Sequence, residues 1–317
     1  MGIPRIPLGD WGEIAFDWFR DTFSWLVDII KVALDTITNG LVDGLLAVPF
    51  PVIILIFALV GWLLRSWQLA VGTALSLLLI VSMDLWTEAM QTLGLVLVAT
   101  IIAVILAVPL GILAAKSDKV SAVFRPVLDF MQTMPAFVYL IPAVLLFSIG
   151  YVPGIFATVI FALPPGVRFT ELGIRGVDSE TVEAGQAFGA TPGKILRGIQ
   201  LPLATPTIMA GINQVIMLSL SMAVLAGFVG ADGLGKEVVA AVSGQRLPLG
   251  IEAGLSIVII AVFLDRVTAA LGNPGDYKTS LIALIRKRRD NRELAKGDSA
   301  NLDVEAAKSK PAVLPTP

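Results

Sequence analysis

Long apolar segments separated by short polar stretches make up most of the chain. A helix that spans a bilayer needs ~20 predominantly apolar residues. Candidate segments lie at 49–64, 67–83, 92–115, 130–149, 152–165, 206–229 and 251–272. The pattern therefore predicts an all-α membrane protein with about seven transmembrane helices. Several segments contain proline, which membrane helices tolerate when neighbouring helices line an internal path.

A different pattern precedes the first apolar segment. Between residues 10 and 46, apolar side chains such as Trp11 and Trp18 alternate with acidic ones such as Asp17 and Asp28 at intervals of three or four. This periodicity predicts an amphipathic helix that lies on the membrane surface. Its acidic face disfavours adhesion to an anionic leaflet, so we expect it on the outer side of the inner membrane.

Basic residues near the ends of the spans predict the orientation, because cytoplasmic loops are enriched in lysine and arginine. If the chain has seven spans, every basic cluster falls on one side: Arg65; Lys116, Lys119 and Arg125; Arg168, Arg175, Lys194 and Arg197; and Arg286, Lys287, Arg288, Arg289 and Arg292. We therefore expect a multi-pass protein of the bacterial inner membrane with a periplasmic N-terminus and a cytoplasmic C-terminus. Beyond residue 292 the sequence loses periodicity, which predicts a disordered tail.

Composition narrows the possible chemistry. Of the 317 residues, 56% are hydrophobic and only 15% are charged, whereas soluble domains carry about 25% charged residues. The net charge of −2 suggests no nucleic-acid partner. The chain has no cysteine and no histidine, which excludes disulfides, Ser-His-Asp triads and the usual zinc or copper sites. We expect no catalytic residue, no metal site and no enzymatic activity in this chain.

The longest polar interruption between spans, residues 166–205, contains a spaced pattern. We expect two short helices here, broken at Gly189 and around Pro192. The pattern consists of Glu183, Ala184 and Gly185, then Gly189, and then Ile199, Leu201 and Pro202. It matches the Glu-Ala-Ala, Gly, Ile-x-Leu-Pro signature of permease subunits of ATP-binding-cassette (ABC) importers, which the chain resembles. One residue departs: Gly185 stands where a second alanine is usual.

Longer runs extend this resemblance across roughly residues 85–275. They are similar to the glycine betaine/proline permeases of osmoprotectant importers and lie at residues 131–142, 161–165, 201–211 and 264–266. The resemblance implies a type I ABC importer permease fold with cytoplasmic coupling helices. Together with the apolar pattern, it divides the chain into an N-terminal amphipathic region (1–48), two N-terminal spans (49–83), a core permease domain (84–275) with the coupling loop 166–205, and a basic, then disordered cytoplasmic tail (276–317).

The resemblance also implies partners and cargo. The cargo would be a quaternary ammonium compatible solute such as glycine betaine, choline or proline betaine. ATP and magnesium would bind to separate cytoplasmic ATPase subunits, with no cofactor on this chain. A periplasmic substrate-binding protein, a second copy of the permease and membrane lipid complete the expected partners. Glu183, Ala184 and Gly185 would seat a helix in a groove of the ATPase, Gly189 would supply a turn, and Pro202 would end the segment.

Polar, aromatic or sulfur-bearing residues inside apolar spans are candidates for the translocation path, because polar groups are costly in lipid. A quaternary ammonium group has no proton to donate, so its path would use aromatic faces and sulfur. The candidates are Met134, Phe137, Tyr139, Asn213, Met217, Ser221 and Met222. For any one of them, simple helix packing is an equal alternative. Asp265 and Arg266 are expected to form an ion pair at the cytoplasmic interface.

A segment from Gly230 to Glu237 has the Gly-x4-Gly-Lys spacing of a phosphate-binding loop. Glu237 replaces the required Ser or Thr, no strand is expected before the segment, and the predicted topology places it outside the cell. We interpret it instead as a periplasmic turn. There Asp232, Lys236 and Glu237 would contact a binding protein or simply face solvent.

Other transport and non-transport functions remain open on the sequence alone. An ABC permease for another small polar solute, such as an amino acid, is the first alternative. An ion-driven secondary transporter would need buried acidic residues at mid-membrane and an inverted repeat, neither of which is clear here. A receptor or scaffold would explain the polar loop but not the proline-containing and polar-containing spans.

Overall fold

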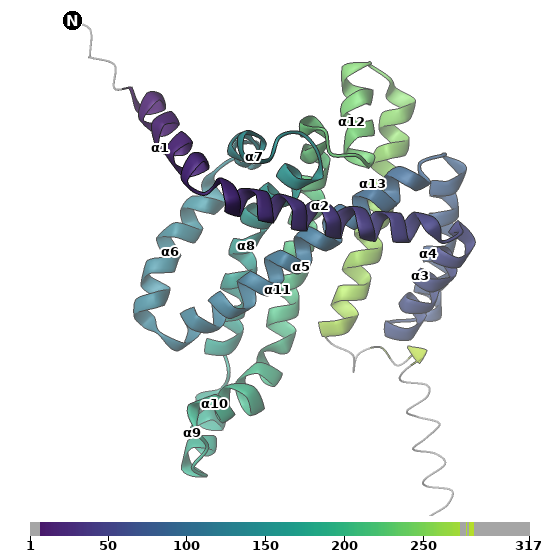
Figure 1. Ribbon diagram of the computed structural model, residues 1–317. Helices are drawn as coiled ribbons and strands as arrows, with labels where there is room; N and C mark the ends of the chain where they lie inside the picture. Colours follow the sequence, from purple (N-terminus) through teal and green to yellow (C-terminus); the bar gives the residue numbers. More distant parts are fainter. Residues whose placement is uncertain (1–6, 273–276, 278, 282–317) are drawn as a thin grey trace, which may run out of the picture.

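The computed structural model describes residues 7–272, 277 and 279–281, which form the helices of Figure 1 and no strand in this part of the chain. The basic cluster at residues 286–292 and the rest of the tail lie outside the described residues. The elements are α1 (Leu8–Thr22), α2 (Ser24–Ala47), α3 (Phe50–Leu64), α4 (Trp67–Ser82), α5 (Trp86–Lys116), α6 (Asp118–Thr133), η1 (Ala136–Tyr139), α7 (Leu140–Phe147), α8 (Tyr151–Arg175), α9 (Ser179–Ala187), α10 (Pro192–Ile195), η2 (Leu196–Gln200), α11 (Leu201–Ala226), η3 (Gly227–Val229), α12 (Leu234–Ser243) and α13 (Leu247–Gly272).

Four helical segments of the described chain are long and apolar enough to cross a membrane, and two bent pairs raise the number to six at most. The four are α5, α8, the run Pro192–Val229 and α13. The predicted spans at 49–64 and 67–83 exist as α3 and α4, but these have only 15 and 16 residues. At 1.5 Å per residue they reach about 22–24 Å, short of a ~30 Å hydrocarbon core.

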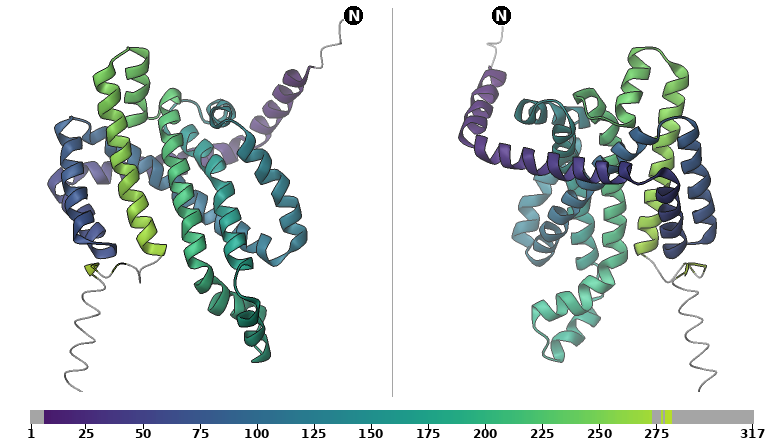
Figure 2. Two further views of the ribbon diagram at one scale, coloured as in Figure 1. Left: turned by 180° about the vertical axis from the view of Figure 1, so that it is seen from behind. Right: turned by 45° about the vertical axis from the view of Figure 1, so that its right-hand side comes forward.

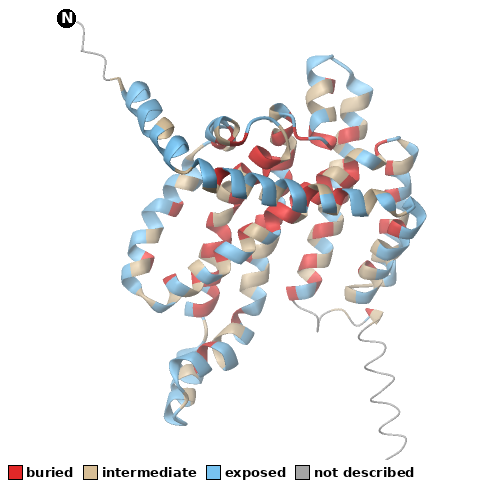
Figure 3. Ribbon diagram, in the orientation of Figure 1, coloured by how far each residue is buried: buried red, intermediate tan, exposed pale blue. Residues whose placement is uncertain are grey.

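Small residues allow the central helices to approach closely. A Cβ atom added at Gly166 of α8 would lie 2.7 Å from the Cβ of Ala107 on α5, and one added at Gly211 of α11 would lie 2.4 Å from the Cβ of Phe169 on α8. Close backbone approach at small residues is the main source of helix association in membranes. The buried residues accordingly concentrate in α5, α8 and α11 (Figure 3).

The N-terminal amphipathic region forms two helices instead of the single helix predicted between residues 10 and 46. The break falls at Phe23, whose ring packs against Phe19 with centroids 5.0 Å apart. Helix α2 then runs across the bundle (Figure 1) and buries Val27, Thr38 and Val42. Because this face of α2 packs on the bundle, only the opposite face, with Trp25 and Ile29, is exposed.

The prediction of one continuous helical span at residues 130–149 is wrong. Helix α6 already begins at Asp118, and the chain bends by 104° between α6 and the η1–α7 segment. The bend lies at Met134, whose ψ of 132° is extended, because a residue before proline is disfavoured in the helical region. The residues predicted as a basic loop between two spans are therefore helical.

Other prolines do not break their helices. Helix α8 passes through Pro164 and Pro165 and ends only at Arg175, beyond the predicted end at residue 165. The expectation that Pro202 ends the segment before the next span is also wrong, because the helical run continues through Pro202 from residue 192 to residue 229. A π-helical turn at Leu196–Gln200 directly precedes this proline. We attribute the wider turn to Pro202, which has no N–H for the bond to residue 198 and crowds that carbonyl.

Candidate functional site

The two ends of the bundle differ in charge and shape. The C-terminal ends of α3, α5, α8 and α13 lie at the end from which α9 and α10 project, and α12 lies at the opposite end (Figures 1 and 2). The chain ends of α5 and α8 carry Lys116 and Arg175, and Arg65 follows α3. The described basic residues predicted to share one side of the membrane therefore do lie toward one end of the bundle.

Local sequence signals define α9 at that end. The Asp178 carboxylate caps the helix by accepting a hydrogen bond from the Glu180 N–H at 3.1 Å. Gly189 has a φ of +75°, and the Ala190 N–H donates to the Gly185 carbonyl at 3.1 Å. This is a Schellman turn, which favours glycine at the left-handed position. Gly189 therefore reverses the chain so that α10 and η2 fold back along α9.

Gly185 packs inward against the same chain. A Cβ added at this residue would lie 2.7 Å from Ile199 Cδ1 and 3.6 Å from Ile195 Cγ1. Ile195 is buried, and Leu201 packs on the cluster that includes Ile174 and Ala204. Gly185, Ile199 and Leu201 thus attach α9 to the lower ends of the long helices.

The remaining residues of the pattern face outward. Glu183, Ala184 and Pro202 are exposed. Phe188, the residue before the turn, is 93% exposed. A short helix held at the end of the bundle thus presents two carboxylates, Glu180 and Glu183, with small residues and an unburied aromatic ring. This combination suits a protein partner, because aromatic anchors dominate many interfaces.

The candidate path residues separate into two groups. Tyr139 and Met222 are buried in one cluster, with Met134 partly buried against it. The Tyr139 hydroxyl donates to the Met131 carbonyl at 2.5 Å. These three side chains pack helices within the chain, whereas Phe137 and Met217 are 48% and 40% exposed and Ser221 is exposed as well.

An exposed stripe runs the length of α11. Its members recur at intervals of three, four or seven and are Leu203, Ala210, Gln214, Met217 and Ser221, with Phe228 in η3 at the far end. The rings of Phe228 and Phe137 meet edge to face with centroids 5.6 Å apart. Near the other end of the stripe, Leu203 and Thr207 line a hollow of about 480 Å³ shared with Asp178 and Thr181. We call Leu203, Ala210, Gln214, Met217, Ser221 and Phe228 the α11 stripe.

Asn213 does not belong to the α11 stripe. Its amide donates to the Asp265 carboxylate of α13 at 2.8 Å, and its own oxygen is buried without a hydrogen-bond partner. Asp265 and Arg266 do approach each other, at 3.7 Å. The shorter contact of Asp265 is with Asn213, so the acid mainly connects α13 to α11.

At the opposite end, the segment from Gly230 to Glu237 cannot cradle a phosphate. The Leu234 N–H donates to Thr92 Oγ1 at 2.8 Å, and the Lys236 N–H donates to the Gly233 carbonyl at 3.0 Å, so these amides are occupied. Lys236 pairs with Asp232 at 2.7 Å. This hydrogen bond and the charge of Asp232 raise the pKa of Lys236. Asp232 and Lys236 are exposed and Glu237 is half-buried.

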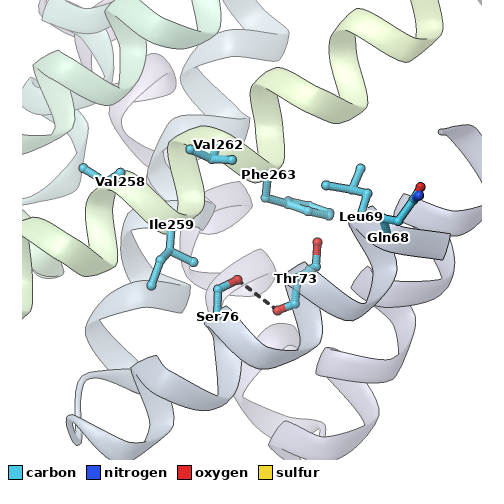
Figure 4. Close-up of a pocket in the computed structure, with 9 residues that line it drawn as sticks. Gln68, Leu69, Thr73, Ser76, Val258, Ile259, Val262 and Phe263 are labelled. Atoms are coloured by element: carbon cyan, nitrogen blue, oxygen red, sulfur yellow. Dashed lines mark hydrogen bonds between the residues drawn. The ribbon is translucent and has the colours of Figure 1, made fainter. Parts of the chain in front are cut away.

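A further groove lies between α4 and α13 (Figure 4). It has a volume of about 280 Å³ and is lined mainly by apolar side chains. Its few polar groups include Ser76, whose hydroxyl donates to the Thr73 carbonyl at 3.1 Å. The groove shares no residue with α9 or the α11 stripe. No group of three or more acidic side chains able to hold a metal occurs among the described residues.

Two exposed aromatic residues extend the sequence-based candidates. Phe188 interrupts a run of small and polar residues directly before Gly189, which was the available signal for it. Phe228 gave no such signal, because its relation to Phe137 depends on how η1 and η3 approach each other.

Comparison with known proteins adds independent information. The pattern of the family described as binding-protein-dependent transport system inner membrane component matches residues 107–273. The glycine betaine transport system permease protein OpuAB of Bacillus subtilis is 48% identical over 266 residues, covering 84% of this chain and 94% of that protein. The glycine betaine/proline betaine transport system permease protein ProW of Escherichia coli is 45% identical over 267 residues, covering 84% and 75%. An inward-facing structure of the MetNI methionine ABC transporter has a TM-score of 0.55 at 20% identity, covering 60% of this chain and 95% of that chain. This last similarity concerns the fold alone.

Proposed function

Because this chain belongs to the family of binding-protein-dependent transport system inner membrane components, we propose that it is the permease of an importer for quaternary ammonium compatible solutes. Its role is that of an ABC importer permease, and the chain is a multi-pass membrane protein. Glycine betaine is the first solute to test, because relatives at 45% and 48% identity carry that solute in their names. Choline and proline betaine share the same cationic group and form the next candidates.

The observation that carries the coupling role is the position of α9. This helix projects from the end of the bundle (Figure 1), is fixed by Gly185 against Ile199, and exposes Glu183 and Phe188. We propose that it docks in a groove of a separate ATPase subunit that binds ATP and magnesium. Approach of two ATPase subunits would then move two copies of α9 together. Because Gly185 of α9 packs against Ile199, and Leu201 of the same run packs on the cluster with Ile174, motion of α9 would tilt the long helices and expose the path outward.

The α11 stripe is the best candidate for the path between two copies of the chain. It presents Met217, Ser221 and the Phe137–Phe228 pair without a carboxylate on the stripe. Aromatic faces and polarisable sulfur attract quaternary ammonium groups. Two copies related by a two-fold axis would double these groups around one route. The buried residues Tyr139 and Met222, and Asn213 with its Asp265 bond, support the walls of this route.

The orientation follows from charge. The basic end with α9 would face the cytoplasm, and α12 with Asp232, Lys236 and Glu237 would face the periplasm. There these residues would contact a substrate-binding protein that selects the solute. The basic cluster at residues 286–292 would also lie in the cytoplasm.

Reconstituted transport tests this function. We expect solute uptake into vesicles only when the permease, an ATPase subunit and the binding protein are present with ATP. Uptake driven by a sodium or proton gradient without ATP would contradict the proposal and favour a secondary transporter. ATP-driven uptake of an amino acid, with no uptake of glycine betaine, choline or proline betaine, would keep the coupling role and overturn the assigned solute class.

A further inference from the structure

Glu171 of α8 is the one acidic or basic side chain among the described residues that is buried, with 8% of its surface exposed. Its carboxylate accepts a hydrogen bond from the Ser121 hydroxyl of α6 at 2.6 Å. Arg175 Nε lies 3.0 Å from the same oxygen, and Arg125 of α6 lies 3.8 Å from it. A buried carboxylate is costly unless it is paired and hydrogen-bonded, so this constellation is maintained by its partners.

Further charged pairs continue on both sides of Glu171. Arg175 donates to the Asp118 carboxylate at 2.7 Å and to the Ala114 carbonyl at 2.8 Å. Toward the other end, Arg168 pairs with Asp129. Positions 168, 171 and 175 lie on one face of α8, and positions 118, 121, 125 and 129 lie on one face of α6. These seven residues form an antiparallel set of contacts that we call the α6–α8 ladder.

The ladder is the main polar attachment of α6. Only Ser121 and Leu128 of this helix are buried, and Leu128 belongs to a small cluster with Ala107 and Val167. The opposite face exposes Val123, Val127 and Phe130. Helix α6 is therefore an arm that contacts α8 along the ladder and through this small apolar cluster.

Each end of this arrangement leads to a candidate functional region. Arg175 is the last residue of α8, and Asp178, the cap of α9, follows after Gly176 and Val177. At its other end α6 bends at Met134 into η1, which carries Phe137 against Phe228. The ladder therefore lies between the exposed helix α9 and the aromatic pair at the far end of the α11 stripe.

We propose that Glu171 is a positioning residue that couples movement of α9 to movement of the α6–η1 arm. This inference rests on the proposed function. Displacement of α9 pulls on the end of α8, and the ladder transmits that displacement to α6 because its directional contacts fix the register of the two helices. Without the Glu171 charge, Arg175 and Arg125 lose their shared partner and α6 can slip along α8. ATP hydrolysis then continues while the path opens less often.

The test measures solute imported per ATP hydrolysed by the complete importer in vesicles. Glu171→Gln keeps the size of the side chain and removes its charge, and we expect the ratio to fall about threefold or more, within the range by which coupling mutations act. Lys119→Gln is the matched control, because it removes a charge from α6, the partner helix, at a position outside the ladder, and its ratio should equal that of the wild type. An unchanged ratio in Glu171→Gln would overturn the proposal.

If the importer that carries Glu171→Gln does not assemble, an exchange of charges between Arg168 and Asp129 tests the proposal instead. Arg168→Asp and Asp129→Arg should each lower the ratio, and the double variant should restore it toward the wild-type value. If the double variant remains as impaired as the single variants, or if the single variants are normal, the ladder does not couple the helices. Failure of the wild-type importer to transport with ATP would contradict the proposed function itself, whereas a wild-type ratio in these variants would contradict only the role of the ladder.

Discussion

At the scale of single residues, position 185 packs α9 against the segment that follows it. The hydrogen side chain of Gly185 leaves room for Ile199, whose Cδ1 would lie only 2.7 Å from an added Cβ. From the resemblance to the permease signature, we expected Gly185 to let the surface of a partner protein approach closely. The structure instead places an isoleucine of the same chain against it, while Glu183 and Phe188 face outward. One sequence pattern therefore contains both internal packing residues and exposed residues.

The size of residue 185 should control ATP-driven uptake. Gly185→Ala should retain uptake, because the tip of Ile199 can rotate away and alanine favours the helix by about 1 kcal/mol over glycine. Gly185→Leu should lower uptake about tenfold or more, because overpacking costs about 1–3 kcal/mol and displaces α9. Uptake by reconstituted vesicles measures both changes. Ile199→Ala should restore part of the loss in the Gly185→Leu background, and no restoration would contradict the packing explanation.

Phe188 should contribute to partner binding and not to folding. Its side chain is 93% exposed, so Phe188→Ala should leave the melting temperature unchanged. The affinity of the Phe188→Ala permease for the ATPase subunit should fall by about tenfold or more, as expected for the loss of an aromatic anchor at an interface. Titration of the ATPase against the purified permease measures this affinity. Phe130→Ala removes another exposed phenylalanine and should bind normally; equal loss in both variants would show that position 188 has no specific role.

At the scale of whole elements, prolines illustrate what the sequence can and cannot predict. The C-terminal ends of α5 and α13 follow closely from their apolar segments, since lipid requires long apolar helices, whereas both helices begin four to six residues before the predicted spans. Pro135 ends a helix, whereas Pro164, Pro165 and Pro202 lie within helical runs. All four have the same local chemistry, so the difference comes from neighbouring helices that fix the direction of the backbone. Tertiary contacts of this kind are absent from a single sequence.

The start of α6 was missed for a related reason. Lys116, Lys119 and Arg125 predict a cytoplasmic loop between two spans, because such loops are enriched in lysine and arginine. In the structure Asp118 and Arg125 face partners on α8, which satisfy their charge within a helix. The pattern from Glu183 to Pro202 could be found from spacing, but the inward role of Ile199 required the reversal at Gly189. The separation of Tyr139 and Met222 from Phe137 and Ser221 likewise required the packing of η1, α8 and α11.

The turn between η3 and α12 should be sensitive to volume. A Cβ added at Gly227 would lie 2.4 Å from the carbonyl carbon of Gly235, and this backbone cannot rotate away as a side chain would. Gly227→Ala should therefore lower the free energy of unfolding by about 1–3 kcal/mol. Thermal unfolding in detergent measures the change. Gly254→Ala, in α13 with open space around it, is the matched control, and equal stability of the two variants would refute the close contact.

On the scale of the whole molecule, the internal core and the exposed faces have different compositions. Alanine, glycine and branched residues fill the contacts among α5, α8 and α11. The face of α4 and α13 that forms the groove of Figure 4 is mainly apolar and suits lipid. The α11 stripe instead includes Gln214, Ser221 and Met217 on an exposed face. Polar side chains on a lipid-facing helix are costly, so this face requires another covering.

A second copy of the chain would supply that covering, and single cysteines can detect it. The chain has no cysteine, so Ser221→Cys introduces one unique thiol on the α11 stripe. If the stripes of two copies face each other across a two-fold axis, the two thiols lie on the same route. Oxidation or a short bifunctional thiol reagent in native membranes should then produce a cross-linked dimer, and a cationic thiol reagent should block uptake unless solute protects the site.

The matched control is Val258→Cys on α13, which is also half exposed but lines the apolar groove beside α4. This variant should form no cross-linked dimer under the same reagents, and modification of its thiol should leave uptake intact. Cross-linking of Val258→Cys with none of Ser221→Cys would assign the interface between copies to α13 and remove the α11 stripe from the path. Cross-linking at Ser221 without solute protection would retain the dimer and exclude this position as a solute contact. The two readouts therefore decide separately whether the polar face of α11 joins two copies and whether solute passes between them.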